Sequence, residues 1–294
     1  MIIDQQTNVV FFSDLLPMRC PMLYESICKI LCDNGIGHGL LTNTKDIWCR
    51  DYMPIQTEEG HFVFYKYNPD YLQTPFYRRT ITNVNLIDRI DCIRHKKVSD
   101  LDLVLDGGNI VKCDNRIIMT KKVFAENKDK KREDIIRMLE DAFQCDIIFL
   151  PWDVEEFLGH SDGIVHYVGE NRVLMTNYAD FDSSKARSFL KILEKHFEVI
   201  SLAYSVKRKH QRSWAYINYL QVGNVVFVPQ LGIPEDEQAI QQIAYALSKC
   251  KVFGVPALES VRKGGALNCI SWNVNSREWH SEFIGEALHA NHTQ

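Results

Sequence analysis

The sequence lacks both a long apolar stretch and a stripe of basic residues. A helix needs about 20 consecutive, mostly apolar residues to cross a bilayer, and no stretch approaches that length. A nucleic-acid binder usually carries a basic face, whereas this chain has a net charge of −4. Its two basic clusters, at 128–132 and 207–212, stand beside acidic or polar segments, as solvated faces do. We therefore expect neither a membrane nor a nucleic acid as partner.

Paired cysteines and a cationic leader are missing as well. The first ten residues contain Asp4 and Asn8 and no Lys or Arg, which argues against a signal peptide. The nine cysteines are scattered without a Cys-x-x-Cys pair. Cys28 and Cys32 are four apart in a helical pattern, which indicates one helix face rather than a metal site. This usage is typical of a reduced cytoplasm, so we expect a cytoplasmic protein without a disulfide framework.

A strand–strand–helix–strand pattern recurs along most of the 294 residues, whose hydrophobic content of 46% supports a sizeable core. The clearest copy begins at Gly159. Its predicted elements are strands 164–168 and 173–176 around the turn 169–171, the helix 183–196 and the strand 198–202. Glycine and asparagine at the turn separate two apolar runs, and the helix shows apolar residues at helical spacing.

Four further copies follow the same order. One runs through a hairpin at 110–123, the helix 132–143 and the strand 146–150; another through a hairpin from 215 to 228, the helix 235–247 and the strand 251–255. A third covers two strands within 46–67 joined at 57–60, a possible helix at 84–93 and the strand 102–105. The last begins at Gly264 with only its first strand, so the N-terminal strand 8–16, helix 21–32 and strand 38–42 supply the rest.

Five units closed by the two chain ends predict a five-bladed α/β propeller, because repeats at such a period mean an array or a propeller. The alternative is an irregular α+β domain, since hairpins followed by helices are common. No linker or low-complexity stretch interrupts the pattern. We therefore expect a single domain over residues 1–294.

Polar residues of unusual type gather at the starts of the units. They are Trp48 and Asp51, Asp106 before two glycines, His160 and Asp162, Asn218, and Cys269 after Gly264-Gly265. In a ring of five units, equivalent strand ends converge on the axis, so these side chains are expected to line one central pocket. Acids and histidine at such positions cost free energy unless they serve something polar.

Each of these residues also has a purely structural interpretation. Asp51 and Asp106 can be turn residues, and Cys269 can be a small buried hydrophobe. In an alternating strand His160 and Asp162 would share one face, as a surface ion pair or as two metal ligands. A zinc site needs a third and fourth ligand, and no His-rich cluster supplies them. We expect no metal and no cofactor.

Five segments, in chain order, resemble motifs of the agmatine deiminase and bacterial peptidyl-arginine deiminase family. The segment from Trp48 to Pro54 is similar to Trp-x-Arg-Asp-Tyr-Gly-Pro, and Asp106 to Asn109 to an acidic-Gly-Gly-Asn run. The others are Gly159 to Asp162, matching Gly-His-x-Asp, Ala215 to Tyr219, resembling Tyr-x-Asn, and the run Gly264 to Cys269. The resemblance spans nearly the whole chain. It implies the pentein fold, a five-bladed α/β propeller, in agreement with the count of units.

The chain departs from the family pattern at several positions. Asn268 stands where agmatine deiminases usually have His, Asp106 where relatives often have Glu, and Met53 where they have Gly. The glycine run before the cysteine is shorter. Residues 69–71 read Pro-Asp-Tyr, where agmatine deiminases carry Trp-Gly and the bacterial peptidyl enzymes carry carboxylate-binding arginines. The resemblance therefore implies the type of reaction but leaves the identity of the substrate open.

The residue types fit hydrolysis of a guanidinium. Ionised Asp51 and Asp162 can each make paired hydrogen bonds to guanidinium N–H groups. The Cys269 thiolate would attack the central carbon. His160 would protonate the departing ammonia and then act as base for water. The resemblance implies a covalent intermediate on Cys269.

Three further residues are expected to bind substrate or shape the pocket, namely Trp48, Asp106 and Asn218, with Asp106 also holding His160. Cys49 is the rival of Cys269, since it lies close to Asp51 in the sequence. In an alternating strand it would point the same way as Asp51, as part of the pocket wall. We predict that Cys269 is the only essential cysteine.

The favoured function is deimination of agmatine or a related small arginine derivative, with ammonia and a ureido product released. A peptidyl-arginine deiminase and an amidinotransferase remain open, as do a non-catalytic pentein-fold binding protein and a thiol amidase. The expected partner is a small guanidinium substrate or a peptidyl arginine. A homodimer is left open.

Overall fold

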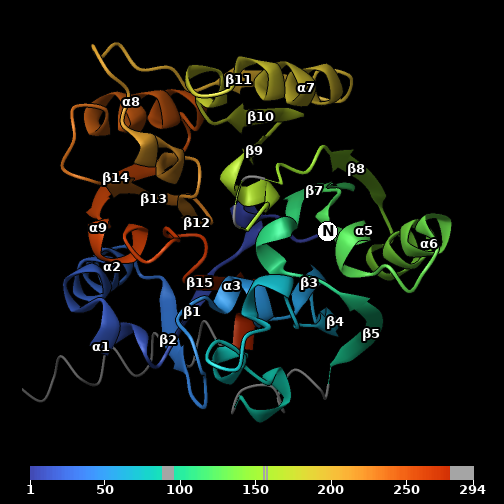
Figure 1. Cartoon of the computed structure of the whole chain (residues 1–294). Helices are drawn as coiled ribbons and strands as arrows, with labels where there is room; N and C mark the ends of the chain where they lie inside the picture. Colours follow the sequence, from blue (N-terminus) through green and yellow to red (C-terminus); the bar gives the residue numbers. More distant parts are fainter. Residues whose placement is uncertain (88–95, 155, 157, 279–294) are drawn as a thin grey trace, which may run out of the picture.

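The structure is a computed structural model that describes residues 1–87, 96–154, 156 and 158–278. Its strands form five three-stranded sheets arranged around a common centre (Figure 1). In every sheet the middle strand pairs antiparallel with one neighbour and parallel with the other. An antiparallel hairpin followed by a parallel return is the predicted unit, so the five-bladed propeller is confirmed.

The sheets, in the spatial order of their strands, are as follows: β15 (Ser271–Val274), β1 (Val9–Ser13), β2 (Gly37–Leu41); β3 (Ile55–Glu58), β4 (His61–Lys66), β5 (Lys97–Val104); β6 (Val111–Cys113), β7 (Arg116–Thr120), β8 (Asp146–Leu150); β11 (Glu198–Ser201), β10 (Arg172–Met175), β9 (Val165–Gly169); β12 (Leu220–Val222), β13 (Val225–Gln230), β14 (Lys251–Pro256). The helices are α1 (Leu16–Arg19), α2 (Pro21–Asp33), α3 (Cys49–Tyr52), α5 (Lys122–Glu126), α6 (Arg132–Phe143), α7 (Ser183–Leu193), α8 (Asp236–Ala246) and α9 (Leu258–Val261). Short 3-10 turns are η1 (Asp4–Gln6), η2 (Asp70–Leu72), η3 (Arg78–Thr80), η4 (Val84–Leu86), η5 (Gly107–Asn109), η6 (Ser161–Gly163), η7 (Tyr178–Asp180) and η8 (Gln211–Tyr216).

The two ends of the chain close the ring. β15 pairs antiparallel with β1, and Phe11 stands opposite Trp272. Their rings lie 5.5 Å apart. Every residue of β1 is buried, as expected for an apolar middle strand that is covered on both faces. The prediction that N-terminal elements complete the last unit is confirmed.

The long helices cover the outside of the ring because each carries one apolar stripe (Figure 1). α2 buries Leu23, Ile27 and Leu31, and α6 buries Ile135, Leu139 and Phe143. Residues four apart lie on one helix face, so each set packs against its sheet. α6 has the predicted bounds, whereas α7 ends three residues before the predicted 196. No described helix is long and apolar enough to span a membrane.

Two unit starts are short helical turns, not the predicted strands. Cys49 and Asp51 belong to α3, and Asp162 belongs to η6, which directly follows His160. The argument that residues two apart share a strand face was therefore wrong. Cys49 donates its thiol hydrogen to the Ile270 carbonyl at 3.0 Å inside the core, so it is not a pocket-wall residue.

Two other predicted elements, the strand at 102–105 and the helix at 84–93, do not match the structure in full. β5 begins at Lys97, five residues before the predicted 102, because its exposed first half pairs with β4 in parallel register. Of the possible helix at 84–93, only Val84–Leu86 is seen as a 3-10 turn. Residues 88–93 lie outside the described part of the chain.

Candidate active site

Three of the predicted site residues meet at Gly108, which belongs to η5. A Cβ atom on Gly108 would lie 2.7 Å from His160 Nδ1, 2.8 Å from Asp51 Oδ1 and 3.2 Å from Asp162 Oδ2. Any side chain here would displace these groups. The Gly108 N–H also donates to Asp51 Oδ1 at 3.0 Å. Glycine is thus required for close approach, and the turns of three separate units come together here.

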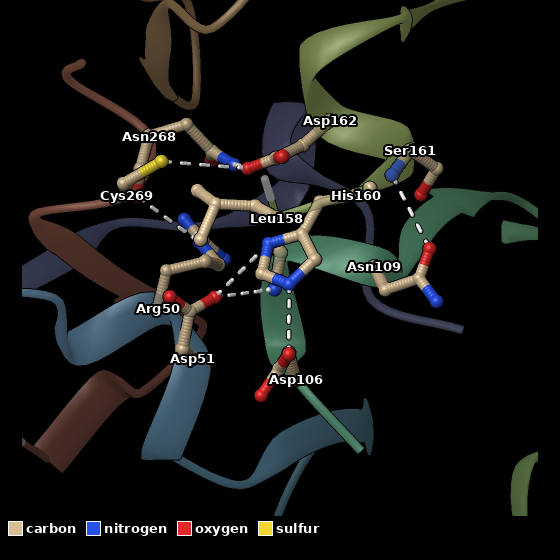
Figure 2. A network of polar contacts seen from close by, with 12 residues as sticks. Arg50, Asp51, Asp106, Asn109, Leu158, His160, Ser161, Asp162, Asn268 and Cys269 are labelled. Carbon is tan, nitrogen blue, oxygen red and sulfur yellow. Dashed lines mark hydrogen bonds and ion pairs between the residues drawn. The ribbon is translucent and has the colours of Figure 1, made fainter. Parts of the chain in front are cut away.

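His160 lies between two carboxylates (Figure 2). Its Nε2 is 2.8 Å from Asp106 Oδ2, and its Nδ1 is 3.7 Å from Asp51 Oδ1. Burial alone would lower the pKa of His160, but the charges of Asp106 and Asp51 outweigh it and raise this pKa to about 9. The imidazole is therefore protonated at neutral pH. Nδ1 has no hydrogen-bond partner within the described residues, so its N–H can serve a ligand as a general acid.

Asp51 is buried in a region with an excess of negative charge. Burial raises its pKa, His160 opposes that rise, and Asp106 and Asp162 add to it, so the pKa of Asp51 stands at about 7. Three carboxylates face one imidazolium here. A cationic ligand would relieve their repulsion, so the electrostatics of the site favour a cation.

Cys269 lies beside Asp162 and Asn268, as Figure 2 shows. Its Sγ is 3.3 Å from Asn218 Oδ1 and 3.8 Å from Asp162 Oδ2. Burial raises the pKa of the Cys269 thiol well above its usual value, and the charges of Asp162 and Asp51 raise it further. The thiol is thus protonated at neutral pH. A cation between these carboxylates would reverse that effect and favour the thiolate.

Two asparagines fix the carboxylate beside the thiol. The side-chain amides of Asn218 and Asn268 both donate to Asp162 Oδ2 at 2.8 Å. The backbone N–H of Cys269 donates to Asn218 Oδ1 at 3.3 Å. Asn218 was predicted for the site, whereas Asn268 entered the sequence analysis only as a departure from a usual His. Its structural role is to orient Asp162.

Arg50 was missed as a residue of the site, although it stands in the first motif. Its Nε donates to the Asn268 carbonyl at 3.2 Å, and its terminal nitrogen donates to Asn273 Oδ1 at 2.8 Å. The backbone N–H of Arg50 donates to the Cys269 carbonyl at 3.1 Å. The buried guanidinium therefore fastens the loop of the thiol to α3, next to Asp51.

A cavity of about 370 Å³ opens from this site, and its inner end is lined by His160, Asp162, Asn218 and Cys269. We call a second set of lining residues its outer wall, because all of them except Asp153 are partly or fully exposed: Asp153, Glu156, Tyr178, Phe181, Asp182, Lys185 and Trp214. The space exceeds what a guanidinium alone needs. A substrate can therefore carry a further group toward the outer wall.

Asp51, Asp106 and Trp48 are not among the residues that line this cavity. Trp48 packs on Gly265, where a Cβ atom would lie 2.3 Å from the indole ring. Asp106 contacts His160 instead. Direct substrate contacts of these three residues stay predictions. Among the described residues, no group of three or more His, Cys, Asp or Glu side chains is placed to hold a metal ion.

Comparison with known proteins gives one family match and several distant relatives. The family model of the Porphyromonas-type peptidyl-arginine deiminases matches residues 24–274. A relative from Marinomonas sp. (strain MWYL1), provisionally named agmatine deiminase, is 25% identical over 209 residues, or 58% of this chain and 57% of that protein. One from Streptococcus mutans serotype c, with the same provisional name, is 25% identical over 305 residues, which cover 85% and 80% of the two chains. The structure of C. jejuni agmatine deiminase is similar with a TM-score of 0.74 at 17% identity, covering 94% of this chain and 95% of that one.

These matches differ in what they establish. The chain spans little more than half the length of the Marinomonas relative. The likeness to the C. jejuni structure shows the pentein fold, which agrees with the five sheets. The family match includes every predicted site residue, from Trp48 to Cys269. The chain therefore belongs to the Porphyromonas-type peptidyl-arginine deiminase family.

Proposed function

We propose that this protein hydrolyses a guanidinium group to ammonia and a ureido product, with the whole chain acting as one catalytic domain. The observation that carries the proposal is the meeting of Asp51, His160 and Asp162 at Gly108, with the Cys269 thiol 3.8 Å from Asp162. Family membership supports it. A thiol amidase would need only the thiol and the imidazole, and would leave the paired carboxylates without a purpose.

Binding of the cation prepares the nucleophile. A guanidinium that pairs with the Asp162 carboxylate brings its central carbon close to Cys269 Sγ, because Oδ2 of that carboxylate lies 3.8 Å from the sulfur. Its charge offsets the carboxylates that hold the thiol proton. The thiol then loses its proton to solvent in the cavity, and the thiolate attacks a carbon whose positive charge is held in place.

His160 supplies the proton for the leaving group. Attack forms a C–S bond, the protonated imidazole gives a proton to one nitrogen, and that nitrogen leaves as ammonia. Water then adds to the carbon with neutral His160 as its base, the C–S bond breaks, and the ureido product and the thiol are regenerated. Asp106 on Nε2 fixes the ring so that Nδ1 faces the Gly108 side.

The outer wall of the cavity favours a substrate with a cationic far end. Among its described residues, the acids Asp153, Glu156 and Asp182 stand against one cation, Lys185, which lies 2.7 Å from Asp153 and 3.6 Å from Asp182. Aromatic side chains of Tyr178 and Trp214 suit an aliphatic chain between the two charges. Agmatine, a guanidinium with an amine at its other end, fits this description. The provisional names of the relatives agree.

An ammonia-release and ureido-product screen tests the proposal. The substrates are agmatine, free arginine, and peptides with internal or C-terminal arginine, each with wild type and Cys269→Ala. We expect agmatine to turn over best, with no product in Cys269→Ala. Ammonia release from peptides alone would make the protein a peptidyl deiminase. Transfer of the amidino group to an added amine, without ureido product, would make it an amidinotransferase. If wild type turns over none of these guanidinium compounds, the proposal is wrong.

A further inference from the structure

Lys122, the first residue of α5, carries a buried ammonium group close to the site but outside the cavity. Its side chain is only 1% exposed. Its Nζ donates to the Leu158 carbonyl at 2.8 Å and lies 3.2 Å from Asp70 Oδ1, 3.5 Å from Glu126 Oε1 and 3.7 Å from Asp106 Oδ2. A buried ammonium is costly unless it is paired. Three carboxylates and one carbonyl provide that pairing.

This cluster is joined to His160 by three separate routes. Asp106 Oδ2 is shared, because it also lies 2.8 Å from His160 Nε2. The Leu158 carbonyl precedes His160 by two residues, so the lysine holds the backbone that leads into the imidazole. Tyr71 stands between them, with its ring 4.5 Å from Lys122 Nζ and 6.2 Å, edge-on, from the His160 ring.

The Asp70–Leu72 turn (η2) is part of the departure from the family pattern at 69–71. The structure places Asp70 and Tyr71 against Lys122 and His160, and neither lines the cavity. The described contacts of the turn include the lysine and the imidazole, and also Glu126, whose Oε1 accepts from the Asp70 N–H at 3.5 Å. The buried side chain of Lys122 has no route to a substrate in the cavity, so its influence must pass through its neighbours.

We propose that Lys122 is a positioning residue for His160, acting through Asp106, the Leu158 carbonyl and the Asp70–Leu72 turn. The kinetic part of this proposal rests on the proposed function, and the titration part does not. Loss of the ammonium releases the backbone before His160 and leaves the shared Asp106 oxygen with the imidazole alone.

The charges around the imidazole determine whether loss of Lys122 raises or lowers the pKa of His160. His160 is faced by Asp51 from α3, Asp106 before η5 and Tyr71 from η2. From α5 both Lys122 and Glu126 act on it. The lysine is faced in turn by Asp70, Asp106 and Glu126. The Lys122 cation opposes the imidazolium and lowers the pKa of His160, whereas the carboxylates raise it.

Titration of the histidine ring nitrogens by NMR tests the proposal without any substrate. The protein is labelled with ¹⁵N-histidine, and the His160 signals are assigned by their loss in His160→Gln. We expect the titration midpoint of His160 to rise in Lys122→Met and to stay near the wild-type value in Lys122→Arg. Lys121→Met is the matched control, since Lys121 is the exposed neighbour. A midpoint that is unchanged or lower in Lys122→Met would overturn the proposal.

Asp70→Asn keeps the proposal testable if Lys122→Met does not fold. The Asp70 side chain is 54% exposed, so its replacement does not disturb the core. With one carboxylate fewer beside the ammonium, Asp106 and Glu126 compensate the cation less completely, so it acts more strongly on His160 and the titration midpoint of His160 should fall. Opposite shifts in the two variants are not expected from a purely structural lysine. An unchanged midpoint in Asp70→Asn would count against the proposal.

Steady-state kinetics provide a second test of the role of Lys122. A positioned acid–base group contributes about 10²- to 10⁴-fold to the rate, so Lys122→Met should lower kcat by about 10²-fold or more and change KM little. Lys122→Arg should recover part of kcat. A kcat in Lys122→Met within about threefold of wild type would overturn the proposal. If wild type itself turns over no guanidinium, the proposed function fails, while the titration still decides the role of Lys122.

Discussion

Replacing Asp51 with Asn removes one negative charge from the site and keeps the shape of the side chain. The amide oxygen of Asn can still accept the Gly108 N–H, which Asp51 Oδ1 accepts at 3.0 Å. What is lost is the anion 3.7 Å from His160 Nδ1, and with it the predicted partner of the guanidinium. We expect Asp51→Asn to weaken both binding and turnover. His160→Asn should instead bind the cation nearly normally and fail in turnover.

The size of the effect follows from burial. Asp51 is 5% exposed, and truncating one partner of a buried, hydrogen-bonded charge pair costs about 2–5 kcal/mol. At about 1.36 kcal/mol for each factor of ten, the lower end is about a 30-fold loss of affinity. Since the pKa of Asp51 is raised to about 7, the full cost is visible only at pH 8 and above, where the carboxylate is ionised.

The same raised pKa predicts how affinity depends on pH. Below pH 7, Asp51 holds a proton that must leave before the carboxylate can pair with a cation. Affinity should therefore fall by up to about tenfold for each pH unit below 7 and level off above it. Asp51→Asn has no such proton, so its weaker binding should be nearly independent of pH over this range.

Calorimetry with agmatine at pH 6, 7 and 8 makes the measurement, in a Cys269→Ala background so that the ligand is not consumed. Buffers of different ionisation enthalpy report proton release, which should approach one proton at pH 6 and vanish at pH 8. If Asp51→Asn binds agmatine as tightly as Asp51 at pH 8, Asp51 is a structural turn residue. The mechanism would then have to be rebuilt on Asp162 alone.

Three further predictions concern the thiol, metals and stability. Cys269→Ala should abolish turnover and Cys49→Ala should retain it, because the Cys49 thiol donates to a carbonyl inside the core; activity in Cys269→Ala would contradict thiol catalysis. Exhaustive chelation should leave turnover unchanged, and a loss that zinc restores would contradict a metal-free reaction. The pKa of His160 rises from an ordinary 6.5 to about 9 in the fold, so its contribution to stability is complete below pH 6.5 and is lost as pH rises through 9. The free energy of unfolding, followed by urea denaturation, should fall across that window, and His160→Gln should show a smaller fall; equal slopes would refute the assignment.

The repeat could be predicted because its signals are local. The helix at 132–143 and the strand at 146–150 were predicted with the bounds that the structure has. Apolar residues four apart identify the helix face, and a continuous apolar run identifies the strand. The incomplete unit after Gly264 required partners from the N-terminus, and β1 and β2 provide them.

The starts of the units could not be predicted in the same way, because contacts distant in sequence decide their conformation. Asp51 is held by the Gly108 N–H, which lies 57 residues further along the chain. Asp162 is held by Asn268, which is 106 residues away. An alternating strand and a helical turn of four residues look alike in such short segments. The sequence therefore indicated which residues converge but not how their side chains are aimed.

The sequence alone does not distinguish the environments of Lys121 and Lys122. They are identical neighbours in the chain, yet one is exposed and the other is buried among Asp70, Asp106 and Glu126. Glu126 is four residues further along the same helix, whereas Asp70 and Asp106 reach Lys122 from earlier parts of the chain. The two departures that obscured the substrate, at 268 and at 69–71, both contact the acid–base and carboxylate groups. Since these positions support the reaction centre in this chain, substrate choice should be sought in the outer wall of the cavity, at Asp153, Asp182 and Lys185.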